Sequence, residues 1–135
     1  WLLRIFLRPR SFVRVLVAGP CTASGGIRRH PDGKWLRRAG DVAQFAQQQR
    51  RLLESLWSVV TPGGRLLYTT CSVFTEENEA PVKSFLGRHH DAIRCALTWP
   101  DGPQRMGDGQ LLPAGGTGED NHDGFFYALL EKRGG

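Results

Sequence analysis

The sequence lacks any long apolar run. No stretch approaches the roughly 18 consecutive apolar residues that a membrane-spanning helix needs, and arginines interrupt the apolar opening Trp1–Arg8. No small-residue cleavage site follows that opening, so the sequence predicts neither a signal peptide nor an anchor. Cysteine is also scarce. Three cysteines without paired spacing argue against a secreted disulfide framework and favour a reducing, cytoplasmic setting.

Patterns for nucleotide and metal binding are missing as well. Gly25 and Gly26 belong neither to a G-x-G-x-x-G fingerprint nor to a phosphate loop with a Lys-Ser/Thr ending. The His-His-Asp trio at 89–91 has no further ligands at useful spacing, so a solvated helix end is the simpler interpretation. The run that begins at Glu119 departs from a calcium-loop pattern, because Glu119 stands in place of the first Asp and Leu130 in place of the closing Glu. We therefore predict no metal, and the lack of a C-x-x-C pair disfavours a thiol redox protein.

Positive charge is concentrated in one short segment. The chain has a net charge of +5, and the segment Arg28–Arg38 holds five basic residues against the single acid Asp32. Taken alone, such a cluster is as compatible with a solvated face as with a binding surface. His30 and Trp35 lie among the charges and offer stacking surface beside phosphate-seeking groups. This combination favours RNA over a membrane surface as a partner.

The most informative stretch runs from Gly63 to Val73. A turn at the glycines is followed by a short apolar and β-branched run, typical of an interior strand, and then by Cys71. Val13–Val17 is a second strand-like run, and it leads into Cys21. Open α/β sheets place their chemistry beyond the carboxyl ends of their strands. We therefore expect the two thiols to meet at one edge of a sheet; the alternative is that both are small buried residues.

The order of expected elements indicates an α/β fold in one domain of 135 residues. Apolar residues at helical spacing predict a helix over 41–60 with 47–51 facing outward. A second helix is expected to begin near 78 and to end near 88, with Glu76 and Glu77 as acids suited to a helix start. Strands are expected over 12–17, 65–70, 92–99 and 124–132, with a long loop over 100–123. A helix followed by a buried strand is the unit of a parallel, helix-covered sheet. Because the chain opens on Trp1 and runs straight into strand-like sequence, we expect a piece of a longer protein.

Two converging thiols beside an RNA-facing segment suit one reaction in particular. Carbon 5 of cytosine is a poor nucleophile, but addition of a thiolate to carbon 6 makes carbon 5 enamine-like and able to attack an electrophilic methyl group. The proton on carbon 5 must then leave so that the enzyme is eliminated, and a second positioned group can assist that release. Covalent methylation of a cytosine is therefore our leading hypothesis.

Four motifs occur in the order in which a known enzyme family has them. They are Pro20–Gly25, Arg28–Asp32 with Lys34-Trp35, Tyr68–Ser72 with Glu76-Glu77-Asn78, and Asp123–Ala128. Over about 12–132 the chain resembles the bacterial small-subunit ribosomal RNA cytosine-5 methyltransferases of the NOP2/Sun family. The resemblance implies the C-terminal half of a Rossmann-like methyltransferase sheet, with helices on both faces and an antiparallel last strand. It also implies S-adenosylmethionine as the methyl donor.

The same resemblance assigns roles to individual residues. Cys71 matches the family's nucleophile, and Cys21 matches the thiol that helps release the product. Small-subunit ribosomal RNA is the implied partner, and the residues that would lie near it are Arg28, Arg29, His30, Lys34, Arg37 and Arg38. The residues that would lie near the cofactor are Ala18, Gly19 and Pro20.

Two departures from the family pattern limit these expectations. The family's Asp-Ala-Pro-Cys reads Ala18-Gly19-Pro20-Cys21 here, so the carboxylate near the base and cofactor is missing, which weakens the selection and positioning of cytosine. The family's N-terminal RNA-binding region and cofactor-loop half are also absent from this sequence, so residues 1–135 represent a partial catalytic domain. The strand at 13–17 would then lack a neighbour and expose an apolar edge. We expect poor cofactor binding and slow turnover, and a non-catalytic RNA-binding remnant is the alternative.

Overall fold

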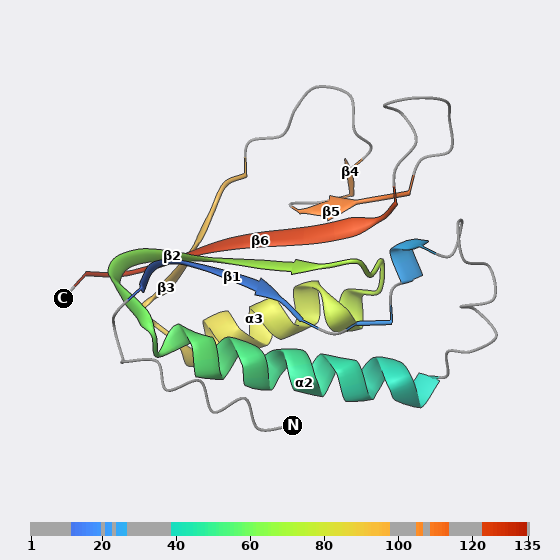
Figure 1. Cartoon of the computed structure of the whole chain (residues 1–135), viewed down its shortest axis with the longest axis horizontal. Helices are drawn as coiled ribbons and strands as arrows, with labels where there is room; N and C mark the ends of the chain where they lie inside the picture. The colour runs from blue at the N-terminus through green and yellow to red at the C-terminus, as the bar shows by residue number, and fades with distance from the viewer. Residues whose placement is uncertain are drawn as a thin grey trace.

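The computed structural model describes residues 12–19, 21–22, 24–26, 39–97, 105–106, 109–113 and 123–134. Its elements, in chain order, are β1 (Phe12–Ala18), the 3-10 turn η1 (Ser24–Gly26), α2 (Ala39–Trp57), β2 (Val60–Thr70), the 3-10 turn η2 (Thr75–Glu77), α3 (Glu79–Arg88), β3 (Ala92–Cys95), β4 (Arg105–Met106), β5 (Gln110–Leu111) and β6 (Phe125–Lys132). The strands form one sheet in the order β1-β2-β6-β5-β4, and β3 also pairs with β6 (Figure 1).

The sheet is mixed. β1 runs parallel to β2, with Val17 opposite Tyr68, as expected for two strands joined through a helix. β6 runs antiparallel to β2, with Ala128 opposite Tyr68. The prediction of an antiparallel last strand is therefore confirmed. The parallel pair brings the carboxyl ends of β1 and β2 to the same edge, which is where both cysteines follow.

The predicted turn at residues 61–64 lies inside strand β2 instead of before it. The strand begins at Val60, which lies opposite Phe12, but Arg14 lies opposite Arg65, so β2 holds extra residues between these two pairs. Gly63 adopts a φ of 81°, a backbone conformation that residues with a Cβ rarely adopt. Pairing with β1 begins before the glycines, because the Phe12 N–H donates to the carbonyl of Val59 at 3.0 Å. The Pro-Gly-Gly run therefore forms an irregular, bulged first part of the strand.

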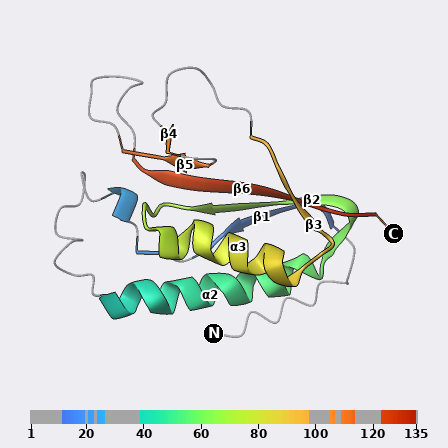
Figure 2. The same cartoon turned by 180° about the vertical axis from the view of Figure 1, so that it is seen from behind.

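Both described α-helices pack on one face of the sheet, as Figures 1 and 2 show from opposite sides. The buried core contains residues of α2, α3, β1, β2 and β6: Val17, Leu53, Trp57, Val60, Leu66, Tyr68, Val82, Phe85, Phe126, Ala128 and Leu130. On the opposite face Leu16 of β1 remains 65% exposed. The helices that the sequence led us to expect on that face do not occur among the described residues.

Helix α2 is shorter than its sequence pattern predicted, and its buried face includes a polar side chain. It ends at Trp57, where the predicted helix continued to 60. Residues 47–51 were expected to face outward, but Gln49 is fully buried. Its amide nitrogen lies 3.5 Å from a carboxylate oxygen of Glu77, which gives this polar side chain a partner inside the protein.

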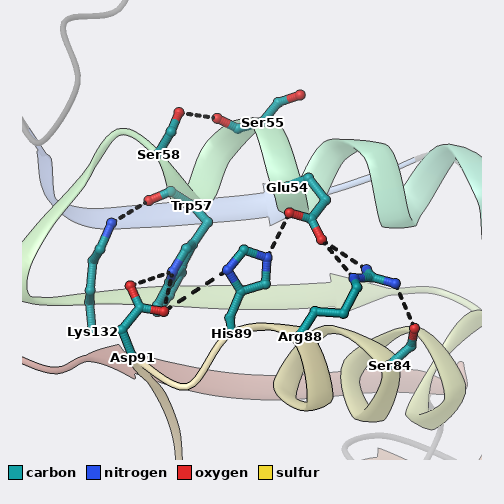
Figure 3. Close-up of polar contacts among 9 residues, drawn as sticks. All are labelled: Glu54, Ser55, Trp57, Ser58, Ser84, Arg88, His89, Asp91 and Lys132. Carbon is teal, nitrogen blue, oxygen red and sulfur yellow. Dashed lines mark hydrogen bonds and ion pairs between the residues drawn. The ribbon is translucent and has the colours of Figure 1, made fainter.

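The ends of α2 and α3 are joined by the polar contacts in Figure 3. Glu54 of α2 lies 2.9 Å from Arg88 and 2.6 Å from His89 Nε2. The indole N–H of Trp57 donates to both carboxylate oxygens of Asp91 at 3.2 Å, and Lys132 Nζ donates to the Trp57 carbonyl at 3.0 Å. Two members of the trio at 89–91, which we interpreted as a solvated helix end, therefore contact α2: His89 through Glu54 and Asp91 through Trp57. Lys132 separately links β6 to α2.

The predicted loop over 100–123 contains two short strands. β4 pairs with β5, and β5 pairs with β6. Gly109 has a φ of 124° where β5 begins, and its carbonyl accepts the N–H of Tyr127 at 3.0 Å. This hairpin places the side chain of Gln110 inside the protein, next to the segment that follows β2. No helix among the described residues is long and apolar enough to cross a membrane.

Candidate active site

Two thiols meet where the parallel strands end. Cys21 follows β1 and Cys71 follows β2, and their Sγ atoms lie 2.9 Å apart. The register explains this approach, because Ala18 and Thr69 are partners at the ends of the two strands. Both cysteines are half-buried, so neither is a core residue of the kind our alternative interpretation required. The expected convergence of the two thiols is confirmed.

The thiol of Cys71 is acidified by its surroundings. The hydrogen bond with Cys21 lowers the pKa of Cys71 to about 7, and a backbone hydrogen bond adds to this effect. Burial and the negative charges of Glu77 and Asp123 act in the opposite direction. Near neutral pH, Cys71 therefore carries a substantial fraction of thiolate, which is the nucleophilic form.

Backbone contacts hold the two thiol-bearing loops together. Gly25 donates its N–H to the carbonyl of Cys71 at 2.9 Å, and Gly124 donates to the carbonyl of Gly25 at 2.9 Å. A Cβ on Gly25 would lie 2.1 Å from the carbonyl oxygen of Gly124 and 2.8 Å from that of Cys71. The Cys21 loop therefore fits between the Cys71 loop and the start of β6 only because residue 25 is glycine.

Two serine hydroxyls add a second connection between these loops. The Oγ of Ser24 lies 3.1 Å from the Oγ of Ser72 and accepts the N–H of Val73 at 2.9 Å. The Oγ of Ser72 also accepts the N–H of Phe74 at 3.0 Å. Both serines are buried. These bonds shape the turn that presents Cys71 at the end of β2.

The buried amide side chains of Asn78 and Gln110 support the turn that carries Cys71. Asn78 Nδ2 donates to the carbonyl of Ser72 at 2.9 Å and to Gln110 Oε1 at 2.7 Å, and Thr70 Oγ1 donates to Asn78 Oδ1. Gln110 Nε2 in turn donates to the Phe125 carbonyl at 3.1 Å. Sequence reasoning missed Gln110, because it lies in a stretch that has no periodic pattern. Asn78 was noted only as part of a motif.

Glu77 is the second residue that sequence reasoning undervalued. It was interpreted as a helix-start acid, yet its side chain is fully buried. Its Oε2 accepts the backbone N–H of Thr22 at 3.0 Å and lies 3.5 Å from Gln49 Nε2. Its Oε1 is buried and has no hydrogen-bond partner among the described residues. An acid near a predicted helix start carried no signal of this burial.

The remaining predicted site residues fall into two groups. Ala18 is exposed at the end of β1, and Gly19 follows it, with Gln49 Cγ 3.6 Å from where a Cβ on Gly19 would lie. The others lie outside the described residues: Pro20, Arg28, Arg29, His30, Lys34, Arg37 and Arg38. Within the described residues, no group of three or more His, Cys, Asp or Glu side chains is placed to hold a metal ion.

Sequence comparisons connect this arrangement to known proteins. A family model described as 16S rRNA methyltransferase RsmB/F matches residues 4–131. The chain is 48% identical over 123 residues to ribosomal RNA small subunit methyltransferase B of Vibrio cholerae, covering 91% of this chain and 26% of the relative. It is 48% identical over 124 residues to the protein of that name from Salmonella agona, covering 92% and 27%. The chain therefore spans about a quarter of the length of these relatives.

Solved structures share the fold. The crystal structure of PH0851 superposes with a TM-score of 0.78 and 41% identity, covering 92% of this chain and 27% of that one. The structure of NSun6 from Pyrococcus horikoshii with SFG gives a TM-score of 0.66 and 28% identity, covering 87% of this chain and 29% of that one. These likenesses confirm the predicted fold class, part of a methyltransferase sheet with helices.

Proposed function

Because the chain belongs to the RsmB/F family of 16S rRNA methyltransferases, we propose that it transfers a methyl group from S-adenosylmethionine to carbon 5 of a cytosine in small-subunit ribosomal RNA. The family depends on S-adenosylmethionine, and SFG, present in one similar structure, is an analogue of it. The observation that carries the proposal is the 2.9 Å contact between the Sγ atoms of Cys21 and Cys71. A ribosomal RNA substrate would also place the protein in the cytoplasm.

Cys71 is the proposed nucleophile. With its pKa lowered to about 7, it holds a substantial thiolate fraction at neutral pH. A lone pair of electrons on the Cys71 sulfur forms a bond to carbon 6 of the cytosine. The electrons of the former 5,6 double bond then make carbon 5 nucleophilic. Cys71 stands at the end of β2 on a turn fixed by Ser72 and Asn78, so its thiol is held for this attack.

Cys21 is the proposed base for product release. While Cys71 is a thiolate, the Cys21 thiol donates to it. Once Cys71 is bonded to carbon 6, that acceptor is gone, and Cys21 can lose its proton to solvent. After the electron pair on carbon 5 has formed the bond to the transferred methyl group, the Cys21 thiolate takes the remaining proton from carbon 5, the C–H electron pair restores the 5,6 double bond, and Cys71 leaves as a thiolate. The 2.9 Å separation of the Sγ atoms supports these two roles, because two thiols this close together would both reach a single pyrimidine ring bound beside them.

The described residues offer S-adenosylmethionine only part of a site. When bound, this cofactor supplies an electrophilic methyl group. The end of β1 presents Ala18, exposed, and Gly19, and neither side chain carries a charge or a hydrogen-bonding group. The described residues therefore fit the cofactor poorly on their own.

A second candidate function is an RNA-binding remnant without catalysis. One observation favours it: Ala18 stands where the family pattern has an aspartate, so the end of β1 lacks a carboxylate to orient the base. The basic segment 28–38 would retain RNA affinity in either case. The two functions differ in whether Cys71 ever bonds to cytosine.

Trapping on a fluorinated substrate separates them. Ribosomal RNA containing 5-fluorocytosine would be incubated with S-adenosylmethionine and the chain, alone or with the N-terminal part of a relative added. Fluorine cannot leave as a proton does, so a methylating enzyme stalls as a covalent protein–RNA adduct on a denaturing gel. Cys71→Ser is the negative control, and Cys95→Ser, in β3, is the matched control.

Each outcome decides between the functions. An adduct that Cys71→Ser abolishes and Cys95→Ser leaves intact supports covalent cytosine methylation with Cys71 as nucleophile. If the adduct forms only with the added N-terminal part, the chain is the catalytic portion of an incomplete enzyme. Absence of an adduct under both conditions, with RNA binding retained in a filter assay, would favour the remnant.

A further inference from the structure

Burial of the Glu77 carboxylate is unfavourable for the stability of the fold. Its side chain is fully buried, and Oε1 has no hydrogen-bond partner among the described residues. A buried carboxylate with an unsatisfied oxygen destabilises a fold, and an apolar side chain of similar size would avoid that cost. The position of Glu77 therefore points to a role beyond packing.

The carboxylate bridges the two thiol-bearing loops. Glu77 lies in η2, six residues after Cys71. Its Oε2 accepts the backbone N–H of Thr22, the residue directly after Cys21, at 3.0 Å. The Glu77 carbonyl accepts the buried hydroxyl of Tyr68 in β2, which fixes the backbone of η2 against the sheet. Glu77 thus ties the Cys21 loop to a rigid part of the molecule.

We propose that Glu77 is a positioning residue for the thiol pair: its carboxylate holds the Thr22 N–H and so keeps the Cys21 thiol within hydrogen-bond distance of Cys71. The role is indirect, because the residue acts through Thr22 and not on the substrate. The inference rests on the proposed function only in treating the thiol pair as catalytic.

The structure gives Glu77 two opposing effects on Cys71. By anchoring Cys21 it preserves the hydrogen bond that most strongly lowers the pKa of Cys71. By its negative charge it raises that pKa. Among the described residues, the ionisable groups that act on Cys71 are Cys21 after β1, Glu77 in η2 and Asp123 before β6. Removing the charge and removing the anchor therefore have opposite consequences, which makes the two effects separable.

The test measures how the alkylation rate of Cys71 depends on pH. The whole chain would be treated with iodoacetamide, and the labelled cysteine would be identified by peptide mass spectrometry. Glu77→Gln retains an oxygen acceptor for Thr22 but no charge, so the midpoint should fall below that of the wild type. Glu77→Ala removes charge and anchor together, so the midpoint should rise above that of the wild type. Glu76→Gln changes an exposed neighbour in η2 and should leave the midpoint unchanged.

A second variant removes the donor of the hydrogen bond between Thr22 and Glu77. Thr22→Pro removes the N–H and leaves the carboxylate in place, so the midpoint should rise at least as far as in Glu77→Ala. This variant decides the question if Glu77→Ala proves unfolded by circular dichroism. A fall of the midpoint in Glu77→Ala, equal to that in Glu77→Gln, would overturn the proposal, because charge alone would then explain the effect. Unchanged midpoints in Glu77→Gln and Thr22→Pro would also overturn it.

This experiment fails independently of the proposed function. Alkylation requires neither RNA nor S-adenosylmethionine. If no 5-fluorocytosine adduct forms but the midpoints move as described, the positioning role stands and methyl transfer by this chain does not. If the adduct forms but the midpoints do not move, methyl transfer stands and the positioning role is rejected.

Discussion

At the scale of single residues, the acidity of Cys71 depends on one neighbour. The hydrogen bond with Cys21 is the largest influence that lowers its pKa to about 7, so removing that thiol returns the pKa toward the ordinary value of about 8.5. We therefore predict that Cys21→Ala slows alkylation of Cys71 roughly tenfold at pH 7, with little change above pH 9. Stopped-time labelling with mass spectrometry measures this. Cys95→Ala is the control, and an unchanged rate in Cys21→Ala would contradict the assignment.

Gly25 provides a second prediction at this scale. A Cβ there would meet the Gly124 carbonyl oxygen at 2.1 Å, so Gly25→Ala must push the Cys21 loop away from the Cys71 loop and β6. We expect a loss of about 2 kcal/mol in the free energy of unfolding, measured by urea denaturation. Gly87→Ala is the matched control, because nothing lies within 4 Å of its Cβ position in α3, and it should stabilise by about 0.5 kcal/mol. Equal effects of the two substitutions would refute the argument.

The thiol pair was predictable from the sequence, but its support was not. Each cysteine directly follows a strand-like run, and parallel neighbours bring such positions together, so local pattern was sufficient for Cys21 and Cys71. Gln49, Glu77 and Gln110 are buried polar residues whose partners lie 28, 55 and 32 residues away in the sequence. Helical periodicity assigns polar residues to the outside, and only the packed structure supplies the partners that keep these three inside.

At the scale of elements, the joint between α2 and α3 should respond to acid. Burial raises the pKa of Glu54, but hydrogen bonds from His89 and Arg88 outweigh it, so the net pKa lies below the ordinary value of 4.5. A carboxylate with a lowered pKa in the folded state stabilises the protein above pH 4.5, and this contribution disappears as pH falls through the lowered pKa.

We therefore predict a pH-dependent effect of Glu54→Gln. The substitution should lower the free energy of unfolding by about 0.5 kcal/mol at pH 7, since the Glu54 side chain is 40% exposed and exposed ion pairs contribute little. The difference from the wild type should shrink as pH falls through the lowered pKa of Glu54. Urea unfolding over a series of pH values from neutral to acid measures this change, with Glu76→Gln as the exposed control. A difference that stays constant over the whole series would show that shape, not charge, accounts for the contact.

Predicted element boundaries were correct where the periodicity of apolar residues was strong. They were wrong where pairing within the sheet determined the boundary. Strand β1 and helix α3 occur close to where they were expected, because apolar spacing and a helix start delimit them. Strand β2 begins before its glycines, because Phe12 already pairs with the chain at Val59 and Val60. The β4–β5 hairpin has two residues in each strand and pairs with β6 through tertiary contacts, which no local pattern of alternation reveals.

At the scale of the whole molecule, cofactor affinity should be low. The chain spans about a quarter of the length of its curated relatives, and Ala18 and Gly19, which we propose to lie near the cofactor, carry no charged or hydrogen-bonding side chain. We predict that isothermal titration of the chain with S-adenosylmethionine gives a dissociation constant above about 1 mM. Ala18→Asp, which restores the family's carboxylate, should strengthen binding if that acid contacts the cofactor. Tight binding by the unaltered chain would contradict this expectation.

The open side of the sheet has a consequence for solution behaviour. β1 is the terminal strand of the described sheet, and its outer edge pairs with no other described strand. Three of its large apolar side chains stay exposed, Phe12 at 38%, Val13 at 60% and Leu16 at 65%. An apolar edge strand with unpaired backbone groups is a template for pairing with a second chain. We therefore expect the isolated chain to self-associate at micromolar concentrations.

Charged substitutions on β1 test this expectation. Leu16→Lys combined with Val13→Lys should shift the chain toward the monomer in sedimentation velocity, because lysines on an edge strand oppose pairing with a second chain. The free energy of unfolding should change by less than about 0.5 kcal/mol, since neither side chain belongs to the buried core. Ile93→Lys, at a 40% exposed position in β3, controls for a general gain in solubility. If Ile93→Lys dissociates the chain as well as the β1 pair does, the edge of β1 is not the surface that associates.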